Sequence, residues 1–105
     1  MNDDRIQYLF NLLEETPKDS FVLFALGKEF EKVGDFEQSA FYFETLKNNN
    51  PDYVGLYLHL GQLYQKMEKS DMAKKVFEEG ILIARKMGDF HALGELNSIL
   101  KQEED

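Results

Sequence analysis

Few side chains in this sequence are spaced for chemistry. His91 and Glu95 lie four residues apart, so on a helix they would share one face, which is the spacing of two metal ligands. Two ligands do not make a metal site, and such pairs are common on helix surfaces. His59 has no serine, cysteine or carboxylate placed by spacing as a catalytic partner, and no glycine-rich phosphate loop occurs. We therefore predict no enzyme and no bound metal or cofactor.

Composition restricts the class of partner. The chain has 105 residues, enough for one domain with a packed core, and a net charge of −8. This charge disfavours nucleic acid and anionic membrane surfaces as partners. No apolar run approaches the roughly 18 residues of a membrane span, and the acidic start Met1-Asn2-Asp3-Asp4 does not fit a secretory signal. Without cysteine there is no disulfide. The default prediction is a cytoplasmic protein.

The dominant pattern is an internal repeat with a period of 34 residues. Residues of the same or similar type keep this offset: Pro17 and Pro51, Leu26 and Leu60, Gly27 and Gly61, Phe30 and Tyr64, Lys32 and Lys66, Ser39 and Ala73, Phe43 and Phe77, Glu44 and Glu78. A fixed period of this length is typical of stacked supersecondary units, none of which can bury its apolar face alone.

The spacing inside each copy is equally regular. The motifs are Leu23-x2-Leu26-Gly27-x2-Phe30 with Ser39-x3-Phe43 and Pro51, then Tyr57-x2-Leu60-Gly61-x2-Tyr64 with Ala73-x3-Phe77. They resemble the tetratricopeptide repeat, a helix–turn–helix unit, over Ser20 to about Ala84. Three positions depart from the family pattern. Ser39 replaces the usual alanine, Gly80 stands where a small or apolar residue is usual, and Arg85 replaces the closing proline of the second repeat. The resemblance implies an all-α, right-handed superhelical stack of antiparallel helix hairpins, with a concave groove lined by the first helix of each repeat.

We predict about six helices in a single domain of residues 1–105. An N-terminal capping helix spans 4–16, repeat 1 spans 20–53, repeat 2 spans 54–87, and a C-terminal capping helix spans 89–101. The last helix is a degenerate first helix of a repeat, because it contains another Leu-Gly pair, at an offset of 33. Its Phe90, Leu93 and Gly94 follow the repeat motif, whereas Asn97 replaces the aromatic residue. The tail after residue 101 is expected to fray.

Local signals predict how the helices begin, end and pack. Gly27 is a poor helix former, which indicates that the paired helix approaches closely there, with small Ser39 opposite. Gly34 can adopt the left-handed conformation that ends a helix, and Asp35 can cap the next one. The second repeat lacks this glycine, and we predict that Ser70 caps its second helix instead.

The resemblance also implies a partner-binding surface. In the family, outward positions of the first helices bind an extended peptide or a helix. Carried over residue by residue, with Ala25, Glu31 and Gly55 also outward, the candidate groove residues are Phe21, Phe24, Lys28, Lys32, Leu58, His59, Gln62, Gln65 and Lys66. Some members clamp a terminal carboxylate with a lysine and an asparagine, but Phe24 and Lys28 stand at those positions. Apolar anchors among local positive charges favour a partner with acidic residues.

Two functions fit these residues. The first is a protein-interaction module or scaffold that binds a peptide or helix of another protein in the groove. The alternative is a structural, homodimeric repeat unit, because open-ended stacks present apolar edges to one another. In that case Phe24 and Leu58 pack against neighbouring helices or a second copy of the chain. An enzyme is the least favoured class, since no nucleophile, metal set or cofactor motif is present.

Overall fold

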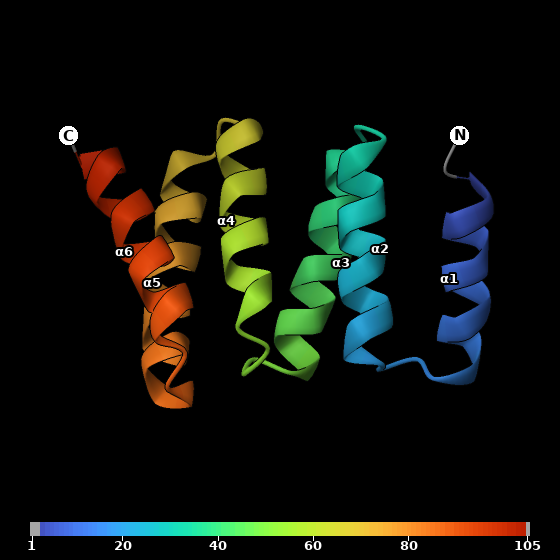
Figure 1. Cartoon of the computed structure of the whole chain (residues 1–105). Coiled ribbons are helices and arrows are strands. Elements are labelled where there is room, and N and C mark those ends of the chain that lie inside the picture. Colours follow the sequence, from blue (N-terminus) through green and yellow to red (C-terminus); the bar gives the residue numbers. More distant parts are fainter. Residues whose placement is uncertain (1–2, 105) are drawn as a thin grey trace. The chain divides into compact units, whose positions relative to one another are not determined.

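A computed structural model describes residues 3–104 of the chain (Figure 1), and every regular element among them is a helix. The helices are α1 (Asp3–Glu15), α2 (Ser20–Lys32), α3 (Phe36–Asn49), α4 (Gly55–Lys66), α5 (Ser70–Met87) and α6 (Phe90–Glu104). Helix α6 continues beyond residue 101, where a frayed tail is predicted from the sequence. Residues 1, 2 and 105, which the predicted domain includes, lie outside the described residues.

The chain divides into two compact units, Met1–Asn50 and Pro51–Asp105. Helices α1 to α3 belong to the first unit and α4 to α6 to the second. The division falls where a residue precedes a proline, and Asn50 is extended there, with φ −147° and ψ 76°. The Asn50 side-chain amide also donates a hydrogen bond of 3.0 Å to Ser20 Oγ, which joins the end of α3 to the start of α2.

In the first unit, Gly27 lets α3 lie close against α2. A Cβ atom at Gly27 would stand 2.6 Å from Phe43 Cε1, so the fully buried Phe43 ring occupies the space that a larger residue would need. Ser39 Oγ donates a 2.6 Å hydrogen bond to the Gly27 carbonyl oxygen. The predicted close approach is thus confirmed, and the hydroxyl of Ser39 has a partner inside the core.

Helix α1 covers the other side of α2. Leu9 is buried with Val22 and Leu26, and three aromatic rings continue this packing toward α3. The rings of Phe30 and Tyr42 stack with centroids 5.7 Å apart. The Phe10 ring is tilted relative to the Phe30 ring, and their centroids are 6.1 Å apart. The apolar face of α1 is therefore used within its own unit, as a capping helix requires.

The second unit repeats this packing with different residues. The Phe77 ring lies against Gly61, and the buried Ala73 stands where the first repeat has Ser39. Gly80 departs from the family pattern because α5 is packed on both sides. A Cβ atom there would lie 2.6 Å from Tyr57 Cβ on α4 and 3.1 Å from Leu96 Cδ1 on α6.

The turn between α2 and α3 and the turn between α4 and α5 have similar backbone conformations but different residues. Gly34 has φ +85° and Asp35 accepts a hydrogen bond from Gln38 N at 3.2 Å, as predicted. At the corresponding turn of the second repeat, Glu68 takes the left-handed conformation, with φ 60°. The predicted Ser70 cap is wrong, because Ser70 is already helical and the cap position falls on Lys69, which makes no side-chain capping hydrogen bond.

Candidate partner-binding surface

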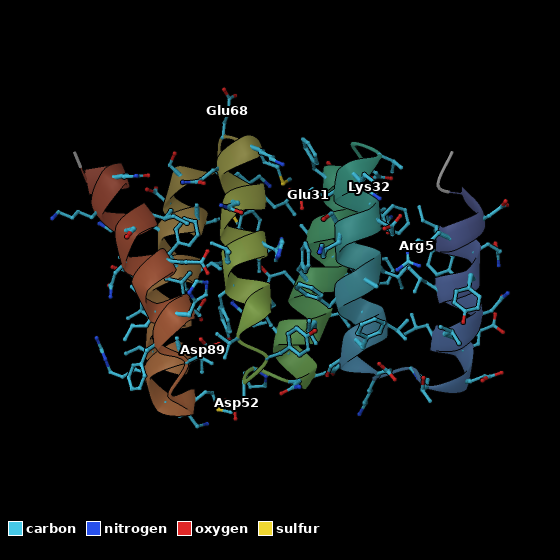
Figure 2. All side chains as sticks on the ribbon, viewed as in Figure 1. Arg5, Glu31, Lys32, Asp52, Glu68 and Asp89 are labelled. Atoms are coloured by element: carbon cyan, nitrogen blue, oxygen red, sulfur yellow. The ribbon has the colours of Figure 1, made fainter. Side chains whose placement is uncertain are left out.

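The first unit has a cleft of about 160 Å³ between α1 and α2. Its lining residues are Arg5, Phe21, Phe24, Ala25, Lys28 and Glu29. Three of them, Phe21, Phe24 and Lys28, are predicted groove residues that follow one another at three- and four-residue spacings along one face of α2. Arg5 comes from α1 and reaches toward α2, while Lys32 lies one turn further along α2 (Figure 2). The structure thus places two aromatic rings and two cationic side chains around one cleft, with Lys32 beside it.

Phe21 and Phe24 occupy different environments in this cleft. Phe21 leaves 65% of its surface exposed, whereas Phe24 is half-buried with its ring edge-on to Phe43 at 5.8 Å. The Lys28 ammonium stands 5.5 Å from the centroid of the Phe24 ring, within the range of a cation–π contact. Phe24 therefore both packs against the core and lines the cleft, while Phe21 is the more accessible apolar contact.

Glu29 forms the polar part of the cleft. It is only 7% exposed, and its Oε2 atom lies 3.3 Å from Arg5 Nε and 3.7 Å from Lys32 Nζ. Its Oε1 atom is buried without a hydrogen-bond partner among the described residues. A buried oxygen of this kind costs free energy until a donor reaches it. The cleft therefore carries an acceptor that its own unit leaves unsatisfied.

Leu58 lies in a separate cleft of the second unit, of about 190 Å³, between α4 and α6. It is half-buried there, and α6 contributes His91, Ala92 and Glu95 to the lining. His91 Nε2 and Glu95 Oε1 are 3.3 Å apart, so the two residues share a helix face as predicted. Within residues 3–104, no three side chains of metal-binding type are grouped closely enough to hold an ion.

The other predicted groove residues line neither cleft. His59, Gln62 and Gln65 are half-buried and Lys66 is exposed. Ala25, also predicted to point outward, lines the cleft between α1 and α2 but is only 8% exposed, because it packs with Leu9 of α1. The preceding helix, here α1, covers some of the positions of a first helix that would otherwise face outward.

Arg5 and Glu29 are the cleft residues that sequence reasoning missed. Glu29 gave a signal, because the 34-residue offset aligns it with Leu63, which is fully buried in the second unit. A carboxylate in a position that the repeat uses for its core marks an exception worth explaining. No sequence signal identified Arg5, since the apolar pattern of α1 predicts which face of that helix is buried but not which residue lies beside each polar side chain.

Comparison with known proteins defines the family. The tetratricopeptide repeat family model matches residues 54–87, the predicted second repeat. A solution NMR structure of a tetratricopeptide repeat domain protein from Salinibacter ruber is 36% identical over 84% of this chain and 89% of that one, with a TM-score of 0.80. A crystal structure of a tetratricopeptide repeat domain protein from the same organism is 36% identical over 82% and 96%, with a TM-score of 0.77. The search of curated proteins returned no match.

The chain belongs to the tetratricopeptide repeat family. This membership confirms the predicted fold class, an all-α repeat of helical hairpins, and defines a protein–protein interaction domain as the general class of function. The family is generally non-catalytic. No helix within residues 3–104 has the length and apolar character needed to cross a membrane.

Proposed function

We propose that this protein binds a short segment of a partner protein through the cleft between α1 and α2. The observation that carries the proposal is Phe21, a large aromatic side chain that stays 65% exposed at the rim of a built cleft. Exposed aromatic residues rimmed by charged groups are the usual centres of protein–protein contacts.

The charges around the cleft favour an acidic partner segment. Arg5 and Lys32 contact the Glu29 carboxylate, and Lys28 lines the same cleft, although the whole chain has a net charge of −8. Glu29 contacts two of these cations, which leaves Lys28 to pair with a carboxylate of the partner above the Phe24 ring. A close charge pair beside apolar contacts adds specificity and speeds association.

The unsatisfied oxygen of Glu29 adds a positional requirement. Oε1 has no hydrogen-bond partner among the described residues and is buried, so a backbone N–H or a hydroxyl of the partner would reach it once the Glu29 side chain turns toward the cleft. This hydrogen bond forms only when the partner is seated, so it favours the bound state without stabilising the free protein. We therefore infer a segment with an apolar side chain for Phe21, a carboxylate for Lys28 and a donor for Glu29.

A peptide selection with matched variants tests the proposal. Random short peptides are selected on the immobilised chain, and the best binder is measured by fluorescence anisotropy. The site variant carries Phe21→Ala and Lys28→Glu. The control carries Phe41→Ala and Lys75→Glu, which remove a similarly exposed aromatic of α3 and an exposed lysine of α5. We expect the site variant to weaken binding by at least about tenfold, and the control by less than about twofold.

Two outcomes would contradict this function. Equal affinity of the site variant and the control would place the peptide elsewhere on the chain. If no peptide is selected, and light scattering shows a wild-type dimer that the site variant converts to a monomer, the cleft would belong to a homodimer interface. Circular dichroism of both variants verifies that they remain folded.

A further inference from the structure

One face of α6 repeats the surface that α2 and α4 use to hold their partner helices. Phe90, Leu93 and Gly94 occupy the positions of Tyr57, Leu60 and Gly61 on α4. On α4 all three are buried, and the Phe77 ring of α5 lies against the glycine. The corresponding residues of α2 are Leu23, Leu26 and Gly27, which are also buried, and the Phe43 ring of α3 lies against Gly27 in the same way.

On α6 the same face is open. Phe90 leaves 73% of its surface exposed, and no atom lies within 4 Å of the position that a Cβ of Gly94 would occupy. A shallow depression of about 580 Å³ covers this face, lined by Phe90, His91, Gly94, Glu95, Ser98 and Ile99. Leu96, on the side of α6 toward α5, is buried and contacts the Gly80 region, so α6 itself is firmly seated.

We propose that this face of α6 is a docking site for an amphipathic helix of another protein. The two complete hairpins specify the chemistry of that helix, because both present the same pair of residues to the same surface. Each has a small residue followed four positions later by phenylalanine, Ser39 and Phe43 on α3 and Ala73 and Phe77 on α5. The partner helix therefore carries a small residue and an aromatic residue with this spacing, and its aromatic ring seats against Gly94.

A second copy of the chain does not supply such a helix. Phe43 and Phe77 are fully buried in their own hairpins, so using either one would require that hairpin to open. On α2, Ser20 and Phe24 have the required spacing, but Phe24 is half-buried and its ring packs edge-on against Phe43. The exposed aromatics of α1 and α3 are Tyr8 and Phe41, which follow acidic residues, Asp4 and Glu37, by four positions, so neither helix has the required pair. The net charge of −8 further favours a helix with a positive net charge.

The sequence of α5 provides a direct probe. A labelled peptide of residues 70–87 contains Ala73 and Phe77 at the required spacing, with four basic and three acidic residues. We expect saturable binding to the intact chain in fluorescence anisotropy. The Phe77→Ala peptide should bind at least about tenfold more weakly, and so should the wild-type peptide to a Gly94→Leu chain. A Lys74→Leu chain, changed at an exposed site on α5, should bind like the wild type.

The variant keeps the test decisive, because leucine is a good helix former and Gly94 has open space around it. Circular dichroism should therefore show unchanged helix content. Absence of binding by the α5 peptide, or undiminished binding to the Gly94→Leu chain, would overturn the proposal. A wild-type dimer in light scattering that Gly94→Leu dissociates would also overturn it, because the face would then belong to a second copy. The Phe21→Ala, Lys28→Glu variant should retain peptide binding, which separates this site from the cleft between α1 and α2.

Discussion

Replacing equivalent glycines by alanine should change stability in opposite directions. Gly27 and Gly94 occupy the same position of the repeat motif, on α2 and α6. Alanine at a helical position gains about 1 kcal/mol over glycine. At Gly27 the added methyl group would meet three atoms of the Phe43 ring at 2.6 to 2.7 Å, and this ring is fully buried. Overpacking of this kind costs about 1–3 kcal/mol.

The expected net effects follow from these two terms. Because the overlap at Gly27 involves a ring that cannot turn into solvent, we take the upper part of the range and expect a net loss of about 2 kcal/mol. At Gly94 no atom lies within 4 Å of the new group, so only the helix term remains. Gly94→Ala should therefore stabilise the chain by up to about 1 kcal/mol. The two variants should differ by about 3 kcal/mol in free energy of unfolding.

Urea denaturation followed by far-ultraviolet circular dichroism measures this difference. The midpoint should fall for Gly27→Ala and rise for Gly94→Ala, with unchanged slopes. A rise for both variants would mean that Phe43 does not fill the space at Gly27. A fall for both would mean that the Gly94 face is already covered in the free chain. The first result would refute the packing assigned to Gly27, and the second would refute the assignment of α6 as an uncovered first helix.

Three further changes have directions set by the structure. Glu68→Gly should stabilise the chain by up to about 1 kcal/mol and so raise its thermal midpoint, because Glu68 has φ 60° where the first repeat has Gly34. A lower midpoint would show that contacts of the Glu68 side chain outweigh this strain. Glu29→Leu should raise the free energy of unfolding by about 1 kcal/mol, since it removes a buried carboxylate with one unsatisfied oxygen. The same change should lower the affinity for the selected peptide. Lost stability with intact peptide binding would contradict both roles of Glu29. Burial raises the pKa of Tyr42 above its ordinary value of 10.0, so the folded state favours the neutral phenol, and this contribution to stability is lost as pH rises past 10. Tyr42→Phe should reduce the alkaline loss of stability in urea titrations at about pH 8 and about pH 11, and an identical loss in both proteins would contradict it.

The repeat pattern contained most of the information about the helices. Regular spacing identified the Gly27 and Phe43 positions, and the structure joins them in one contact. Turn chemistry identified Gly34 because glycine is the residue that takes a left-handed conformation without strain. The same reasoning missed Glu68, whose residue type disfavours the conformation that the repeat imposes on it. Here the packing of the hairpin outweighs the local preference of one residue.

The candidate site was only partly predictable for a different reason. A sequence pattern locates a residue on its own helix but does not identify which neighbouring helix faces it. Phe21 and Lys28 were therefore found on α2, whereas Arg5 was missed because it comes from α1. His91 and Glu95 were identified as a pair on one face, but their position opposite Leu58 depends on how α6 packs within its unit.

A nuclear magnetic resonance titration tests the central claim most directly. The isotopically labelled chain would be titrated with the peptide selected on the immobilised protein, and its backbone amide shifts followed residue by residue. The proposed function predicts that the largest changes fall on Arg5, Phe21, Lys28 and Glu29, which line the cleft between α1 and α2. Changes confined to other surfaces, with these four amides unmoved at saturation, would contradict it.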